Sequence, residues 1–482
     1  MPEWWHILIA LIVLAHLAGL LFSVDAIMYG RTPQGTIGWS VALMILPYAT
    51  VPLYLMFGAR RFEGYVRARR RRRGAIAEFA VRLERTLAPH TTTLRDTNHG
   101  DTAVSKMLAT PVTRDNAVRL LIDGDEFFPA VWELIDTAKA HLVVQFYIIR
   151  GDETGLMLKA RLLAAVRRGV KVWLLYDAIG SSALSNDYLN ELQASGVEVA
   201  GFKALRGPRM RLQINFRNHR KMVVADGHTS IIGGMNVGDE YRSLQPECAP
   251  WRDTGLMVSG PASLEGQLAF AEDWYCSTGK LPDLNWEARS AEEVTPGAGK
   301  PNARVVIAPT GPADELPTGA LMVLHLISSA KSRLWIATPY FVPDLTVVEA
   351  LQLASLRGVD VRIITPVTSD SFLVRMAMLS YEPEIIPSGA RMYAHQPGFM
   401  HQKVVLSDDV AAVGSLNLDN RSMRINFELM GLVADKAFVA AVEAMLLKDL
   451  KDCLEITQGS LRKQHWGVRV GARLARLVSP IL

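Results

Sequence analysis

Two long apolar stretches open the chain. Residues 4–24 and 37–57 contain no Asp, Glu, Lys or Arg, and each is about 20 residues long, the length that a helix needs to cross a hydrocarbon core of about 30 Å. They predict a hairpin of two membrane-spanning helices, of which Pro47 and Pro52 are expected to kink the second. A cleaved signal peptide is the alternative for the first stretch, but that stretch lacks a basic flank and a clear small-residue cleavage site.

The rest of the chain alternates twice between strand-like and helix-like hydrophobic patterns. The first series predicts strands at 118–122, 142–148 and 170–176 and helices at 129–138 and 156–168. The second series predicts strands at 304–308, 334–337 and 359–365 and helices at 320–330 and 347–357. Alternating elements of this kind predict an α/β fold, a mixed sheet with helices on both faces. We therefore expect two tandem α/β domains.

The changes of pattern also predict the domain limits. They are a transmembrane hairpin (1–59, with helices at about 4–24 and 37–57), a basic juxtamembrane segment and linker (60–110), a first α/β domain (111–281), a linker (282–302), a second α/β domain (303–460) and a basic amphipathic tail (461–482). The tail has the pattern of a helix that lies at a membrane interface, and packing against the domain is the alternative.

Charge places these parts relative to the membrane. The chain of 482 residues has a formal net charge of +4, and arginines gather at Arg60, Arg61, Arg67 and 69–73, just after the second apolar stretch. The positive-inside rule then puts everything after residue 58 in the cytoplasm. These arginines are also expected to attract anionic lipid headgroups. Three widely spaced cysteines fit a reducing compartment better than a disulfide framework.

One pattern of reactive residues occurs twice. Both copies read His-x-Lys-x4-Asp and are followed by a glycine-containing turn with an asparagine. Their members are His219, Lys221, Asp226 and Asn236 in the first copy and His401, Lys403, Asp408 and Asn417 in the second. Because the spacing recurs, the two copies predict one active site assembled from two halves. Each copy is also predicted to form a β-hairpin, with strand-like runs at 222–225 and 229–232 and at 404–406 and 410–413, and with its histidine and lysine on one face of the first strand.

A phosphodiester suits this set of side chains. Lysine and amide donors can neutralise the non-bridging oxygens, so no metal ion or other cofactor is expected. One imidazole can attack phosphorus to give a phosphohistidine while the other protonates the leaving oxygen, and the second imidazole then acts as a base. Asn236, Asn417 and Ser415 are expected to bind the phosphate; the first half has Gly234 where the second has Ser415.

Four carboxylates accompany the two copies. Asp253 and Glu428 occupy comparable places downstream and are expected to hold the tautomers of the imidazoles. Asp226 and Asp408 are counted with the candidate catalytic residues as members of the motif, although their places at turns favour a capping role.

These residues resemble the phospholipase D superfamily and, within it, the bacterial cardiolipin synthase family. The resemblance rests also on the stretches 176–181, 338–343 and 414–422 and on the spacing of Arg31, Pro33, Thr36, Trp39, Pro47, Tyr54 and Gly58. It implies two phospholipase D-like domains on the cytoplasmic face of a bacterial inner membrane. It also implies that phosphatidylglycerol and other anionic phospholipids are the partners, with no nucleic acid and no obligate protein partner.

The resemblance further implies that two phosphatidylglycerol molecules give cardiolipin and glycerol, with His219 as nucleophile and His401 as acid. The halves are nearly symmetric, so the pattern alone leaves the nucleophile open. It also leaves open a hydrolase of the phospholipase D type, a synthase with phosphatidylethanolamine as donor, a nucleic-acid phosphodiesterase and a non-catalytic scaffold.

Overall fold

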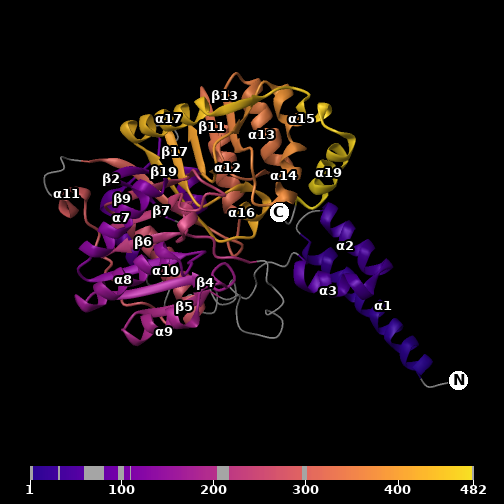
Figure 1. The fold of residues 1–482 in the computed structure, drawn as a ribbon, viewed down its shortest axis with the longest axis horizontal. Coiled ribbons are helices and arrows are strands. Elements are labelled where there is room, and N and C mark those ends of the chain that lie inside the picture. Colours follow the sequence, from indigo (N-terminus) through magenta and orange to yellow (C-terminus); the bar gives the residue numbers. More distant parts are fainter. Residues whose placement is uncertain are drawn as a thin grey trace.

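Two α/β halves form the body of the molecule, and the N-terminal helices extend from one end of it (Figure 1). The computed structural model describes residues 4–30, 33–58, 81–95, 102–108, 110–202, 216–295 and 301–479. The first half is purple to pink and the second orange to yellow in Figure 1.

The first half is a seven-stranded mixed sheet. Its order is β2-β9-β7-β6-β3-β4-β5, parallel from β3 to β5 and antiparallel elsewhere. The strands are β2 (Val112–Ile122), β3 (His141–Phe146), β4 (Lys171–Asp177), β5 (Glu198–Phe202), β6 (Met222–Ala225), β7 (Thr229–Gly233) and β9 (Thr254–Ser259). The main helices are α7 (Asp123–Thr137), α8 (Glu153–Arg167), α9 (Asn186–Ala194) and α10 (Ser263–Thr278).

The second half repeats this order and adds one edge strand. Its order is β10-β19-β17-β16-β11-β13-β14-β20, parallel from β11 to β14. The strands are β10 (Ala303–Thr310), β11 (Arg333–Ala337), β13 (Asp360–Pro366), β14 (Arg391–His395), β16 (Val404–Ser407), β17 (Val410–Gly414), β19 (Glu428–Ala434) and β20 (Cys453–Ile456). The main helices are α12 (Thr318–Ser329), α13 (Leu345–Leu356), α14 (Phe372–Leu379), α16 (Asn420–Arg424), α17 (Lys436–Lys451) and α19 (Trp466–Leu477).

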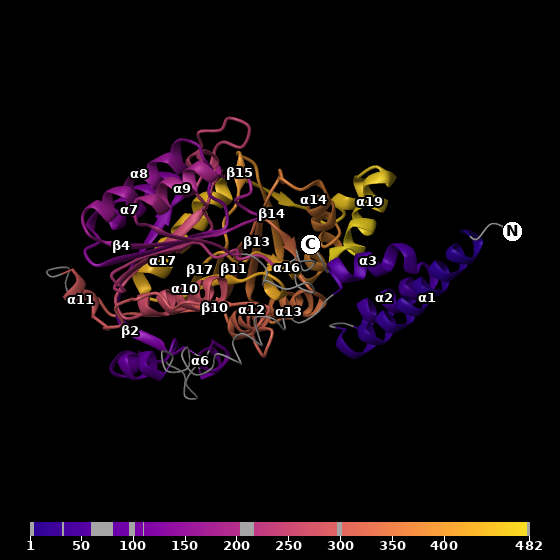
Figure 2. The same cartoon turned by 90° about the horizontal axis from the view of Figure 1, so that it is seen from below.

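The inner faces of the two sheets share one hydrophobic core. Strands β2 and β10 pair, and the central core contains residues of both halves together with α10 and α17. A Cβ on Gly431 of β19 would lie 2.4 Å from Leu256 of β9, so the sheets approach closely there. Helices α7, α8 and α9 cover the outer face of the first sheet, and α12 and α13 that of the second (Figure 2). This packing fixes the relation between the two halves.

All ten strands and helices predicted from the two alternating series are present, which confirms the α/β prediction. The largest difference is at α7, which begins at Asp123 rather than at residue 129. Pro129, with which the predicted helix began, lies inside α7. The helix starts earlier because Asp125 and Glu126 place acidic groups at its N-terminus, and Glu126 accepts a hydrogen bond from the amide of Ile122 at 3.0 Å.

The predicted hairpin of two continuous spanning helices is wrong. Helix α1 (Trp4–Tyr29) is long and apolar enough to cross a membrane, and among the described residues it alone meets that test. The second apolar stretch forms two shorter helices, α2 (Pro33–Ile45) and α3 (Pro47–Phe57). The chain breaks at Leu46 because Pro47 has no N–H to donate and its ring clashes with a preceding helical turn. Both short helices pack against α1.

The predicted juxtamembrane arginines of 60–73 lie outside the described residues. The limits of the predicted domains stay a prediction.

Candidate active site

Each motif lies at one end of a β-hairpin. The hairpins β6–β7 and β16–β17 have the predicted pairing, with Ala225 opposite Thr229 and Ser407 opposite Val410. The motif residues 219–221 and 401–403 were predicted to lie on these strands but precede them. Their side chains therefore lie beyond the strand ends, at the edge where the two halves meet.

The two motif aspartates lie at the opposite, turn end of the hairpins. Asp226 and Asp408 have φ of 55° and 51°, a left-handed conformation that Asp tolerates in turns. The carboxylate of Asp226 accepts hydrogen bonds from the amides of residues 139–141, and that of Asp408 from those of residues 331–333. Each therefore ties its turn to the start of a neighbouring strand. These contacts support the capping role and not the catalytic one.

Backbone hydrogen bonds between the halves hold the motif histidines. The amide of His219 donates to the carbonyl of Phe427 at 2.9 Å, and the amide of His401 donates to the carbonyl of Arg252 at 2.7 Å. Phe427 and Arg252 each precede one of the downstream carboxylate residues. Each histidine therefore lies beside the carboxylate of the other half.

The histidine–carboxylate pairs are consequently crossed. Nδ1 of His219 lies 2.8 Å from the carboxylate of Glu428, and Nδ1 of His401 lies 2.8 Å from that of Asp253. Both carboxylates are completely buried. A carboxylate on Nδ1 places the proton there and leaves Nε2 free to attack or to exchange a proton. Because the partners come from opposite halves, neither half holds a complete site by itself.

A buried arginine supports each of the two crossed histidine–carboxylate pairs. Arg220 binds Asp273 of its own half at 2.9 Å and donates to the carbonyl of Glu428 at 3.1 Å. Arg252 of the first half pairs with Asp449 of the second at 2.8 Å, and Gln402 binds the same carboxylate. Charge-assisted hydrogen bonds of this kind are short and directional. They fix the angle at which the halves bring their histidines together.

The two motif lysines, Lys221 and Lys403, lie close enough for the charge of one to affect the pKa of the other. Nζ of Lys221 donates to the carbonyl of His219 at 2.7 Å, and Nζ of Lys403 to that of His401 at 2.5 Å. Burial lowers the pKa of Lys221 to about 7 and that of Lys403 to about 8, and each ammonium further lowers the pKa of the histidine of the opposite half. Both lysines therefore act on both histidines, which places the two clusters within electrostatic range of each other.

Burial also shifts the pKa values of the two motif histidines and of their carboxylate partners. It lowers the pKa of both His219 and His401 to about 4, against the opposing effect of the carboxylates. For Asp253 and Glu428, burial favours the neutral form, but the neighbouring histidines and lysines outweigh it and lower the pKa. The site therefore holds neutral imidazoles and charged carboxylates near neutral pH, the state that a nucleophilic histidine needs.

The three predicted phosphate-binding residues have different surroundings. Asn236 accepts from the amide of Ile148 and donates to Tyr241 Oη at 2.7 Å. Oδ1 of Asn417 is buried without a hydrogen-bond partner among the described residues. The hydroxyl of Ser415 donates to Glu428 at 2.6 Å, so in this structure its proton serves the carboxylate that orients His219.

Asp253 leaves no room for a side chain at the position that matches Ser415. A Cβ added to Gly234 would lie 2.2 Å from Oδ1 of Asp253. We expect Gly234→Ala to displace Asp253, lower the turnover rate about 100-fold and reduce stability by about 1–3 kcal/mol. Gly151→Ala is the matched control, because nothing lies within 4 Å of its added Cβ. Wild-type turnover in Gly234→Ala would contradict this packing.

Two aromatic side chains beside the histidines were not predicted, those of Tyr147 and Trp251. The Tyr147 ring lies 5.0 Å from that of His219 and 5.4 Å from Nζ of Lys221, and the Trp251 ring lies 5.2 Å from that of His401. Trp251 precedes Asp253 by two residues, which was an available signal. Tyr147 follows strand β3 and has no motif spacing, so only the fold brings it to the site.

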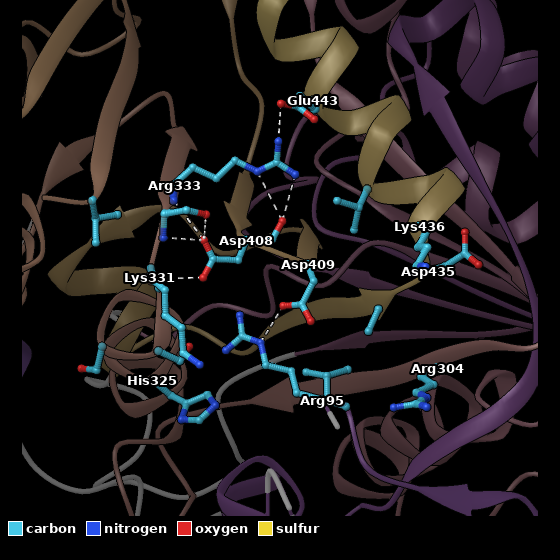
Figure 3. Close-up of a pocket in the computed structure, with 18 of the residues that line it drawn as sticks. Arg95, Arg304, His325, Lys331, Arg333, Asp408, Asp409, Asp435, Lys436 and Glu443 are labelled. Atoms are coloured by element: carbon cyan, nitrogen blue, oxygen red, sulfur yellow. Dashed lines mark hydrogen bonds and ion pairs between the residues drawn. The ribbon is translucent and has the colours of Figure 1, made fainter. Parts of the chain in front are cut away.

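A large cavity of about 1630 Å³ lies around the turn of Asp408 and includes neither motif histidine in its lining. Figure 3 shows Arg333 between Asp408 and Glu443, and Arg95 against Asp409. These basic groups are held by the protein's own acceptors. The position of Asp408 in this wall agrees with its structural role.

Comparisons with known proteins agree with this geometry. A family model described as "Cardiolipin synthase, PLD-like domain" matches residues 131–251 and 323–450, which contain both motifs. The chain is 43% identical over 477 residues to Cardiolipin synthase A of Pseudomonas entomophila (strain L48), covering 98% of each sequence. The chain belongs to the cardiolipin synthase family. The predicted resemblance to this family is thereby confirmed.

Other similarities of this cardiolipin synthase family member extend over most of its length. Cardiolipin synthase A of Pseudomonas aeruginosa (strain UCBPP-PA14) is 42% identical over 476 residues, covering 98% of this chain and 96% of the relative. The crystal structure of phosphatidylserine synthase from Haemophilus influenzae Rd KW20 has a TM-score of 0.56 at 18% identity and covers 84% of this chain and 100% of that one. At that identity it shows the shared fold.

Proposed function

We propose that the chain is a phosphatidyltransferase that makes cardiolipin and glycerol from two phosphatidylglycerol molecules. The crossed histidine–carboxylate pairs carry the proposal, because they build one site with two oriented imidazoles and two ammonium groups. Membership of the cardiolipin synthase family supports phosphatidylglycerol as donor and acceptor. No obligate protein partner, nucleic acid, metal ion or other cofactor is part of the proposal.

In the first step, Nε2 of His219 attacks phosphorus, and the bond from phosphorus to the oxygen of the headgroup glycerol breaks. His401 gives its proton to the departing glycerol. Burial lowers the pKa of His401 to about 4 in the empty site, and the bound anionic phosphodiester raises its proton affinity. Lys221, Lys403 and the asparagine amides neutralise the charge on the non-bridging oxygens.

In the second step, neutral His401 removes a proton from a headgroup hydroxyl of another phosphatidylglycerol. That oxygen attacks phosphorus, the bond to His219 breaks, and cardiolipin leaves. One phosphate ester replaces another, so the exchange needs no nucleotide. The motif histidine side chains are at most 12% exposed, which limits the access of water to the intermediate.

Product analysis of the purified, full-length protein tests this function. With phosphatidylglycerol and a chelator in the buffer, we expect cardiolipin and glycerol in equal amounts. Phosphatidic acid without cardiolipin would instead identify a hydrolase. A mixture with phosphatidylethanolamine labelled in its phosphatidyl group tests the other donor: label in cardiolipin would show that this lipid serves.

The pH dependence should report the two buried lysines. Their pKa values of about 7 and about 8 mean that the empty site loses positive charge as the pH rises through this range. We expect kcat/KM for a short-chain, soluble phosphatidylglycerol to fall as the pH rises above about 7, where Lys221 begins to lose its proton, since this parameter follows the free enzyme. Lys171→Met, at an exposed site, is the control and should keep the wild-type profile. A flat profile from pH 7 to 9.5 would contradict the assignment.

For the membrane arrangement, we propose that α1 anchors the chain in a bacterial inner membrane with both α/β halves on the cytoplasmic side. The arginines of 60–73 support this orientation. Helices α2 and α3 pack against α1 and are proposed to return the chain to the same side.

A further inference from the structure

The C-terminal helix α19 carries an apolar stripe that nothing in the described structure covers. Trp466, Val470, Leu474 and Leu477 are 68%, 45%, 59% and 75% exposed. Their spacing of four, four and three residues puts them on one side of the helix. Arg469 and Arg473 are exposed and border this side.

The helix packs against the body through a different side. Ala472 and Ala475 are buried, and a Cβ on Gly471 would lie 3.0 Å from Met376 of α14. Arg476 pairs with Glu384 at 2.8 Å. Small residues and one ion pair therefore attach α19 to the second half. The large apolar side chains are left for another surface.

A second exposed apolar group lies at the start of α14, the helix against which α19 packs. Phe372 and Leu373, in its first turn, are 76% and 43% exposed. Asp370, two residues before this helix, accepts a hydrogen bond from Tyr340 at 2.7 Å, and its charge raises the pKa of the catalytic Lys403 against the larger effect of burial. The exposed start of α14 thus lies close to the shared phosphate site.

We propose that α19 and the first turn of α14 form a second membrane contact, which rests the active site on the surface of an anionic bilayer. Figures 1 and 2 both place α19 beside the N-terminal helices, on the side of the body from which they extend. Residues 461–482 contain five Lys or Arg and no Asp or Glu, which fits anionic headgroups. An apolar stripe with a basic border is the surface that enters the headgroup region.

This contact would present the site at the depth of the lipid phosphates. Helix α1 holds the chain on the membrane but leaves the orientation of the body undetermined. The stripe supplies a second attachment, and two attachments define which face of the body meets the lipid. The inference rests on the proposed action on membrane lipid, and its first test does not depend on enzymatic activity.

Fluorescence quenching by bromine-labelled lipids tests the contact directly. The full-length protein is reconstituted into phosphatidylglycerol-containing vesicles, with bromine on the upper part of the acyl chains. The difference between wild type and Trp466→Phe isolates the emission of Trp466. We expect this emission to fall by about half or more. Unchanged emission would overturn the proposal, as would efficient cross-linking between copies through Leu474→Cys, since a second copy would then cover the stripe.

Kinetics of a charged variant provide the second test. We expect Leu474→Glu together with Leu477→Glu to raise the bilayer concentration of phosphatidylglycerol needed for half-maximal rate about tenfold. Turnover of a short-chain phosphatidylglycerol in solution should stay unchanged. Leu156→Glu, at a 49% exposed site on α8, is the control and should alter neither rate. An equal loss on both substrates, or no loss on either, would overturn the proposal.

Discussion

His219→Ala should lower the rate of cardiolipin formation by about 10⁴-fold or more, because it removes the proposed nucleophile that forms the bond to phosphorus. His401→Ala should cause a loss of similar size with phosphatidylglycerol, since the leaving glycerol needs a proton. The two variants are therefore indistinguishable with the natural substrate. Their activities should differ with a substrate whose leaving group needs no proton.

A phosphatidyl ester of p-nitrophenol provides that leaving group. With it, we expect His401→Ala to release a burst of nitrophenolate close to one per enzyme, and His219→Ala to give none. Rapid-mixing absorbance measures the burst, and unchanged thermal unfolding shows that both variants keep their fold. A burst from His219→Ala without one from His401→Ala would show that the roles are reversed.

Glu428→Gln should behave like a defect in His219, and Asp253→Asn like a defect in His401, although each carboxylate belongs to the opposite half of the chain. Each variant keeps the hydrogen-bonding shape but no longer fixes the imidazole tautomer. The expected loss is about 10⁴-fold, the size found when the triad aspartate of a serine protease is changed to asparagine.

The same activated ester separates these two variants. Asp253→Asn should keep the burst, whereas Glu428→Gln should lose it, because Glu428 lies 2.8 Å from the proposed nucleophile. Asp409→Asn is the control, since this largely exposed carboxylate pairs with Arg95 far from the motif histidines. If the burst instead depended on Asp253 and not on Glu428, the crossed assignment would be wrong.

The sequence predicted much of the site because the motif is local and repeated. Two hairpins with a turn at Asp226 and at Asp408 follow from pairs of short apolar runs joined at a turn-forming aspartate. Their repetition predicted that His219 and His401 act together. Downstream position also identified Asp253 and Glu428 as the carboxylate partners.

The local sequence pattern could not predict that each histidine pairs with the carboxylate of the opposite half. This pairing depends on how two sheets pack, and on the hydrogen bonds of His219 to Phe427 and of His401 to Arg252. The aromatic ring of Tyr147 reaches the site for the same reason. Ser415 was predicted to bind phosphate, but its single proton is given to Glu428, a choice that only side-chain geometry reveals.

The membrane segment shows a different limit. Hydropathy alone treats 37–57 as one helix, since no charged side chain interrupts it. Pro47 divides it, because a missing N–H and a steric clash act at one residue and hardly change an average over many.

Trapping the covalent intermediate tests the central claim most directly. The full-length enzyme is mixed with phosphatidylglycerol labelled in its phosphatidyl group, quenched within milliseconds at alkaline pH, digested and examined by mass spectrometry. The account predicts one phosphatidyl group per chain, on His219. An adduct on His401, adducts on both histidines, or none on either would contradict it.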